Sequence, residues 1–186
     1  MDLVPTSLAD VLILIPRRFG DARGWFSETW NASRMAEAGL DLTFVQDNHS
    51  FSAARGTLRG LHFQRPPRAQ DKLVRCSRGA ILDVAVDIRE GSATYGRWVA
   101  VELTADNGRQ LLVPKGFLHG FVTLTDDTEV QYKCTDFYSP DHDGAVRWDD
   151  PAIGIDWGIS APILSDKDAR APLLAEIGTP FRREAT

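Results

Sequence analysis

The stretch Leu58–Gln64 holds a histidine that is well placed to take a proton from a substrate. We predict a strand here, because apolar side chains alternate with Gly60, His62 and Gln64. The polar face therefore carries an imidazole, whose pKa lies near neutral pH without tuning. Such a group can act as a general base toward a weakly acidic C–H proton. A solvated strand face or a structural histidine would give the same local pattern, so the assignment depends on the neighbouring strands.

Two further reactive side chains are predicted to point into the interior. Lys72 shares its strand face with Val74, and Tyr132 shares its face with Val130. Burial of an unpaired polar group is costly, and a common polar pocket would supply the partners. Taken singly, the tyrosine could be a core residue with its hydroxyl at the rim, and the lysine could extend to water. The coincidence of the three residues predicts a proton-transfer pocket.

These residues are carried by many short strands that turn residues separate. The predicted strands are Val11–Ile15, Trp25–Trp30, Leu58–Gln64, Lys72–Ser77, Ala80–Ile88, Trp98–Leu103, Gln110–Val113, Gly120–Thr125 and Glu129–Thr135, with a turn over Phe19–Gly24. His49 and His142 are expected to lie in polar turns. Such spacing is typical of an all-β sandwich or barrel. Short helices are expected over Ala32–Ala38, capped by Asn31, and near Leu173–Ile177. No linker or repeat divides the chain, so residues 1–186 are predicted to form one domain.

Composition narrows the class of protein. The chain has 186 residues and a net charge of -5, which argues against general nucleic-acid binding. Arginine outnumbers lysine 17 to 4, which suits an anionic small molecule, although a GC-rich coding sequence gives the same bias. Cys76 and Cys134 are far apart, which fits a reducing compartment. Val11–Ile15 is too short to span a membrane, and we expect a cytoplasmic protein.

A second histidine raises the question of a metal. Gly108 to His119 matches the second cupin motif, G-x5-P-x-G-x2-H, with Thr123 in place of the usual final Asn. The first cupin motif would add H-x-H and a Glu, but this chain offers only His62-Phe63-Gln64. A first-row metal normally needs three or more protein ligands. We therefore predict a barrel with no metal and no other cofactor.

Several segments together resemble one family. They are Phe19-x-Asp21-x-Arg23-Gly24-x-Phe26-x-Glu28, Gln46-Asp47-Asn48-x-Ser50, Leu58-Arg59-Gly60-Leu61-His62-x-Gln64, Lys72-x-Val74-Arg75, Asp83-Val84-Ala85-Val86-Asp87-Ile88-Arg89, Ser92-x-Thr94-Tyr95-Gly96, Pro114-x-Gly116-Phe117-x-His119-Gly120-Phe121, Tyr132-Lys133-x-Thr135 and Leu164-Ser165-x-Lys167-Asp168. The ordered set resembles the dTDP-4-dehydrorhamnose 3,5-epimerases, the metal-free branch of the cupins. The resemblance implies a homodimeric cupin-type jelly-roll β-barrel with short peripheral helices.

The resemblance also implies a reaction and a role for each site residue. The substrate would be a dTDP-4-keto-6-deoxyhexose, inverted at C3 and C5, the carbons that flank the C4 ketone. His62 would be the base, oriented by Asp168; Tyr132 would be the acid on the opposite face; and Lys72 would stabilise the enolate oxygen. The residues expected around the nucleotide sugar are Phe19, Arg23, Glu28, Gln46, Asn48, Arg59, His119 and Tyr138.

Other functions remain open at this point. An epimerase acting at C3 alone could use the same base and acid. A ketoisomerase on the same scaffold is disfavoured because both His62 and Tyr132 are present. A non-catalytic nucleotide-sugar-binding cupin would have lost at least one of His62, Tyr132 and Asp168. For the dimer, Val11–Ile15 is predicted to be an edge strand that exchanges with a partner subunit.

Overall fold

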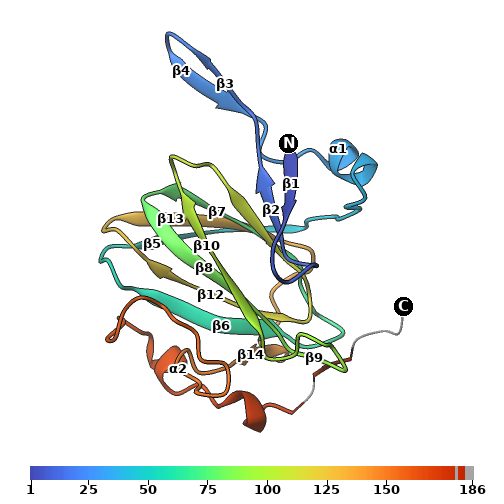
Figure 1. Cartoon of the computed structure of the whole chain (residues 1–186), viewed down its shortest axis with the longest axis vertical. Helices are drawn as coiled ribbons and strands as arrows, with labels where there is room; N and C mark the ends of the chain where they lie inside the picture. Colours follow the sequence, from blue (N-terminus) through green and yellow to red (C-terminus); the bar gives the residue numbers. More distant parts are fainter. Residues whose placement is uncertain (179, 183–186) are drawn as a thin grey trace.

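Two antiparallel sheets face each other and confirm the predicted all-β jelly roll (Figure 1). The structure, a computed structural model, describes residues 1–178 and 180–182. The first sheet has the order β1-β2-β11-β7-β13-β5, and the second has the order β10-β8-β12-β6-β14. Two smaller ladders join β3 to β4 and β15 to β9.

The first sheet contains β1 (Asp2–Pro5), β2 (Leu12–Ile15), β5 (Gln46–Ser52), β7 (Lys72–Arg78), β11 (Gln110–Val113) and β13 (Thr128–Cys134). The second contains β6 (Leu58–Gln64), β8 (Ala80–Asp87), β10 (Trp98–Thr104), β12 (Phe117–Thr123) and β14 (Asp143–Ala145). The remaining elements are β3 (Arg18–Asp21), β4 (Gly24–Ser27), β9 (Arg89–Glu90), β15 (Phe181–Arg182), the helices α1 (Ala32–Glu37) and α2 (Asp166–Ala169), and a 3-10 turn, η1 (Leu174–Glu176).

Most predicted strands lie within two residues of the observed ones, and the differences are local. The strand predicted from Gly120 begins at Phe117, so that His119 lies within β12. The turn expected over Phe19–Gly24 is instead the hairpin of β3 and β4. Asn31 caps α1 as predicted, since its side chain accepts a hydrogen bond from the Arg34 N–H at 3.1 Å.

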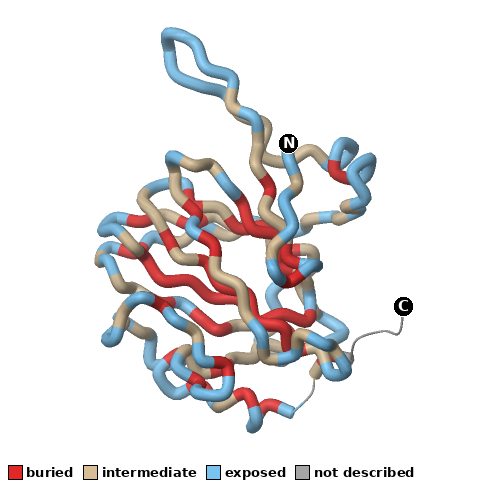
Figure 2. The backbone as a smooth tube through the Cα atoms, viewed as in Figure 1, coloured by how far each residue is buried: buried red, intermediate tan, exposed pale blue. Residues whose placement is uncertain are grey.

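The second sheet is buried on both of its faces. Toward the first sheet, Ala85 and Phe121 pack with Val74 and Val130. On the other face, apolar residues of β6, β8 and β12 pack against the C-terminal segment through Trp157 and other side chains. Figure 1 shows this segment running below β6, and Figure 2 shows the continuous red band of buried residues through the strands. The second sheet is therefore held firmly, which fixes any side chain that it projects between the sheets.

The alternation predicted for Leu58–Gln64 breaks at Gly60, and this part of the prediction is wrong. Leu58 and Leu61 both pack in the cluster beneath β6, although they are three residues apart. Gly60 has a φ of +133°, and the pairing of β6 with β12 shifts register at this level. A Cβ on Gly60 would lie 2.6 Å from the Gly120 Cα, so the two strands can approach only because both residues are glycine. The irregularity places Arg59 and His62 on the same side of the sheet.

The hairpin of β3 and β4 projects away from the two sheets (Figure 1). Its base is held by Arg18, whose guanidinium donates to the carbonyl of Asp106 at 2.6 Å and stacks 4.2 Å from the Trp25 ring. The pale blue hairpin in Figure 2 is exposed along its length beyond this anchor. The expectation of an edge strand at Val11–Ile15 is wrong, because β2 pairs with β1 on one side and with β11 on the other.

Candidate active site

A cavity of about 430 Å³ opens between the two sheets. Its wall includes the four residues expected to carry the chemistry and two of those expected to bind the sugar nucleotide. The lining residues are Ser50, Thr57, Leu58, Arg59, His62, Lys72, His119, Phe121, Tyr132, Ile163, Leu164, Ser165, Lys167 and Asp168. Residues separated by more than a hundred positions in the sequence thus meet at one site.

The predicted base, His62, forms a tight pair with the carboxylate of Asp168. His62 Nε2 donates to Asp168 Oδ1 at 2.6 Å, and the His62 side chain is 31% exposed while that of Asp168 is 4% exposed. Burial raises the pKa of Asp168, but hydrogen bonds from His62, Ser165 and the Gly60 N–H, with the charge of His62, bring the pKa below its usual value. Asp168 is therefore a carboxylate at neutral pH. It fixes the ring so that Nδ1 carries the lone pair, as a general base requires.

The predicted acid, Tyr132, and Lys72 lie on the opposite sheet. Tyr132 belongs to β13 and Lys72 to the adjacent strand β7, with both side chains facing the second sheet as predicted from strand parity. Burial raises the pKa of Tyr132, an effect strengthened by Cys134 and opposed by Arg59, so the phenol keeps its proton well above neutral pH. Burial lowers the pKa of Lys72, and electrostatic interactions with Cys134, Asp143 and Asp83 oppose that effect. A substrate between the sheets would meet the base on one face and the acid on the other.

A second cavity of about 400 Å³ shares His62, Lys72 and Tyr132 with the first. Gln46 and Asn48 line it from β5, and the Gln46 Nε2 donates to Asn48 Oδ1 at 3.0 Å. Gln46 Oε1 accepts the Tyr138 N–H at 2.8 Å, which holds this 57% exposed aromatic residue at the rim. The space beside the reacting groups thus ends at an exposed aromatic ring, a surface that suits stacking with a nucleobase.

Two further predicted residues lie in the first cavity. Arg59 donates to Ser52 Oγ at 3.2 Å and to the Phe51 carbonyl at 3.0 Å, which fixes a cation at the cavity wall. His119 is almost fully buried, and its Nε2 donates to Asp83 Oδ1 at 2.8 Å. The structure therefore brings together nine of the twelve predicted residues around the two adjoining cavities.

Comparison with known proteins decides the family. The family model for dTDP-4-dehydrorhamnose 3,5-epimerase matches residues 5–176. The chain belongs to the dTDP-4-dehydrorhamnose 3,5-epimerase family. The Salmonella typhimurium enzyme of that name is 55% identical over 176 residues, which cover 94% of this chain and 96% of the relative. The protein is accordingly an isomerase.

Solved structures agree with this assignment. The Bacillus anthracis dTDP-4-dehydrorhamnose 3,5-epimerase, with TDP and PPi bound, superposes with a TM-score of 0.90 at 50% identity, over 92% of this chain and 98% of that one. The Legionella pneumophila dTDP-6-deoxy-D-glucose-3,5-epimerase, in complex with dTDP-4-keto-L-rhamnose, gives a TM-score of 0.94 at 42% identity, over 100% and 99% of the two chains. Both agreements extend over nearly the whole fold.

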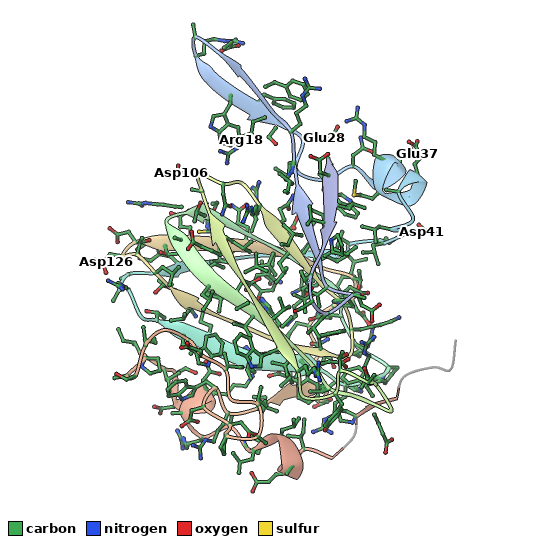
Figure 3. The ribbon with its side chains drawn as sticks, viewed as in Figure 1. Arg18, Glu28, Glu37, Asp41, Asp106 and Asp126 are labelled. Atoms are coloured by element: carbon green, nitrogen blue, oxygen red, sulfur yellow. The ribbon has the colours of Figure 1, made fainter. Side chains whose placement is uncertain are left out.

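Three residues that the family pattern expects near the nucleotide sugar lie elsewhere in the single chain. Phe19 and Arg23 belong to the projecting hairpin, and Arg23 pairs with Asp21 at 2.6 Å. Glu28 follows the hairpin and accepts a hydrogen bond from Arg34 at 2.9 Å, and Figure 3 shows it between the hairpin and α1. As far as the described residues define the cavity walls, none of the three contributes to them.

The two remaining histidines, His49 and His142, lie outside the walls of the two adjoining cavities. His142 lies in a turn and bonds to Ser139 Oγ at 2.7 Å, as expected. His49 does not lie in a turn; it belongs to β5 and contacts Glu129 at 3.1 Å. Within residues 1–178 and 180–182, no group of three or more His, Cys, Asp and Glu side chains could hold a metal ion. No helix of this part of the chain is long and apolar enough to cross a membrane.

The sequence reasoning left several site residues without a role. Lys167, beside Asp168 on α2, lines both cavities and forms an ion pair with Asp143 of β14. Ser50 lines the first cavity, and Asp83 supports His119 from β8. An aspartate within the apolar run of a predicted central strand was a usable signal for Asp83, because buried carboxylates are rare without a partner. Nothing in the local pattern around Ser50 or Asp143 indicated a cavity.

Proposed function

We propose that this protein converts dTDP-4-keto-6-deoxy-D-glucose to dTDP-4-keto-L-rhamnose, within dTDP-L-rhamnose biosynthesis. The observation that carries the proposal is the pair of His62, on one sheet, with Asp168 of α2, across a shared cavity from Tyr132 and Lys72 on the other sheet. Inversion at carbon needs a base on one face of the sugar and an acid on the other. Two facing sheets supply that arrangement.

Each group has a role that its surroundings support. His62 takes a proton from a carbon next to the C4 ketone, and Asp168 stabilises the imidazolium that forms. The electrons of the broken C–H bond move to the C4 oxygen, where the Lys72 ammonium stabilises the enolate. Tyr132 returns a proton to the opposite face of the same carbon. Its raised pKa suits a group that must hold its proton until the enolate has formed. None of these steps calls for a redox or pyridoxal cofactor.

The nucleotide is assigned to the space beside the reacting groups. Arg59 is fixed at the wall of the first cavity, and a guanidinium suits a diphosphate. Gln46 and Asn48 line the adjoining cavity, where Tyr138 offers its ring at the rim. His119, from the family pattern, completes this set. Arg59→Ala should raise the KM for the dTDP-sugar by roughly tenfold or more with a smaller effect on kcat.

We also infer a homodimer in which the hairpin of one subunit reaches the cavity of the other. The hairpin exposes Phe19 at 51%, Trp25 at 61% and Phe26 at 69%, an apolar surface that a partner would cover. This arrangement would bring Phe19, Arg23 and Glu28 to a substrate that they cannot reach within their own chain. A monomer in sedimentation experiments at micromolar concentration would contradict it.

A mixing experiment tests the shared site directly. His62→Ala and Arg23→Ala should each be inactive or nearly so as pure proteins. After the two are unfolded together and refolded, half of the dimers are mixed, and each of these has one intact site, so about a quarter of the wild-type activity should return. No recovery would mean that Arg23 acts in its own subunit, and full activity of pure Arg23→Ala would mean that it does not act at the site.

The nearest alternative is an epimerase that inverts C3 only. Incubation with dTDP-4-keto-6-deoxyglucose in heavy water, followed by NMR, separates the two: deuterium at C3 and C5 supports the proposal, and deuterium at C3 alone supports the alternative. His62→Ala should abolish exchange, and Tyr132→Phe should retain some exchange with little net inversion. Absence of exchange in the wild-type protein would support a non-catalytic nucleotide-sugar-binding protein.

We infer a cytoplasmic location from cysteine usage. Cys76 and Cys134 are both buried free thiols, which fits a reducing compartment. Fractionation of cells that express the protein, with known marker enzymes as controls, tests this inference.

A further inference from the structure

Two buried polar atoms point to a function for Asp83. Among the described residues, Ser50 Oγ and Asp83 Oδ2 are the buried side-chain atoms without a hydrogen-bond partner. Ser50 lines the first cavity, and Asp83 contacts His119 in the same wall. Leaving a buried carboxylate oxygen unpaired is costly, so its retention calls for a functional reason.

The Asp83–His119 pair is hydrogen-bonded through the same atoms as the His62–Asp168 pair. In each, the carboxylate accepts from Nε2, at 2.8 Å for His119 and at 2.6 Å for His62. Neither Nδ1 has a hydrogen-bond partner within the described residues, so both Nδ1 atoms are available as proton acceptors. His62 and His119 are also directly opposite in the ladder between β6 and β12, which brings their Cβ atoms to about 5 Å.

The two pairs differ in how firmly the carboxylate is held. Asp168 accepts a hydrogen bond from His62, its backbone N–H donates to Ser165 Oγ, and interactions with His62, Ser165 and the backbone of Gly60 lower the pKa of its carboxyl. Asp83 is fully buried and accepts one, from His119. Asp168 is therefore stabilised as a permanent anion, whereas Asp83 depends on His119 for its only partner within the described residues. A carboxylate in that position gains most when its histidine becomes an imidazolium, because the pair is then an ion pair.

The double inversion creates a need for such a group. After the first inversion, His62 holds the proton taken from carbon, and Tyr132 has become a phenolate. The second inversion needs His62 neutral and Tyr132 protonated again. One proton must therefore move from the His62 imidazolium to the Tyr132 phenolate while the sugar remains bound, with no net gain or loss.

We propose that the Asp83–His119 pair carries this proton and so resets the site between the two inversions. His119 Nδ1 receives the proton as the N–H bond of His62 breaks, and Asp83 stabilises the resulting imidazolium. The proton then passes to the Tyr132 oxygen, which leaves all three groups as they began. Asp83 acts through His119 and is a positioning residue. The proposal rests on the double inversion of the proposed function, because an enzyme that inverts one carbon needs no reset within a turnover.

The test compares the two inversions within the same molecules. Wild-type protein and Asp83→Asn, each in excess over dTDP-4-keto-6-deoxyglucose in heavy water, are quenched over time, and NMR gives the rate of inversion at C3 and at C5. Asparagine keeps the size of the side chain but cannot form the ion pair. We expect the ratio of the slower to the faster inversion rate to fall roughly tenfold or more in Asp83→Asn. The ratio does not depend on how much of the variant protein is folded.

Two controls separate this role from others. Lys72→Met removes the enolate partner, which both inversions need, and should lower the two rates by a similar factor. His119→Asn keeps a hydrogen-bond donor to Asp83 and should lower the ratio of the two inversion rates as Asp83→Asn does. It replaces Asp83→Asn in the test if that variant fails to fold. If Asp83→Asn leaves the ratio of the two inversion rates unchanged, whether or not both rates fall, the proposed relay is overturned. Inversion at one carbon only, or at none, in the wild-type protein would instead overturn the proposed function.

Discussion

The best-defined electrostatic feature outside the active site is the Asp87 carboxylate, and it gives a prediction with a calculable size. Asp87 is fully buried at the end of β8 and accepts hydrogen bonds from Arg89, Ser92 and Thr94, the shortest at 2.6 Å from Ser92 Oγ. The Arg89 chain in turn lies against Gly116, where a Cβ would come within 2.6 Å of it. The cluster thus holds the turn that leads into β12, the strand that carries His119.

The magnitude follows from the pKa of this carboxyl. Burial raises the pKa, but the hydrogen bonds from Arg89, Ser92 and Thr94 outweigh that effect and lower it from 3.8 to about 2. Each pKa unit corresponds to about 1.4 kcal/mol, so ionised Asp87 contributes about 2 kcal/mol to the free energy of unfolding. Because the folded-state pKa is the lower one, this contribution is complete well above pH 4. It falls as the pH drops from about 4 to about 2, and roughly half is lost by pH 3.

Urea unfolding of the wild-type protein and Asp87→Asn at several pH values tests this reasoning. At pH 6 the variant should be less stable by about 3 kcal/mol, since it leaves the largely buried Arg89 without its main partner. By pH 3 the difference should shrink by about 1 kcal/mol. Asp149→Asn, which removes a half-exposed ion pair with Arg147, should cost less than about 1 kcal/mol. A difference between wild type and Asp87→Asn that stays constant from pH 6 to pH 3 would refute the assigned pKa.

Three further predictions concern the active site. Because burial lowers the pKa of Lys72 and raises that of Tyr132, we expect Lys72 to set the basic limb of kcat/KM, and Lys72→Arg to move that limb to higher pH. Asp168→Asn should lower kcat by roughly 100-fold or more with little change in KM, as measured by steady-state kinetics. Gly60→Ala should cost at least about 2 kcal/mol in urea unfolding and lose most activity, whereas Gly91→Ala, at a φ of +80° and with open space around it, should cost about 1 kcal/mol and keep activity.

Strand parity predicted the inward position of Lys72 and Tyr132, because β7 and β13 are regular where these residues lie. The same rule failed at Gly60, where two glycines let the backbones of β6 and β12 approach and the register shifts. Alternation along one strand contains no information about such a contact with another. The position of Phe19, Arg23 and Glu28 outside the cavities of their own chain was hidden for a different reason: their distance from the cavity depends on how a hairpin leaves the barrel, which no local periodicity encodes.

The irregularity at Gly60 also explains how β6 can both pack apolar side chains beneath the sheet and direct polar side chains into the cavity. If side chains alternated regularly along β6, Leu58 and Leu61 would lie on opposite faces of the sheet. One of them would then lie between the two sheets. The shift keeps both in the apolar layer beneath β6 and directs Arg59 and His62 into the cavity. His62 is therefore anchored by apolar packing on the far side of its own strand, and Asp168, to which it is hydrogen-bonded, belongs to the C-terminal segment that supplies that packing. Loss of packing in that segment should therefore lower catalysis before it unfolds the barrel, since it displaces Asp168 while both sheets remain paired.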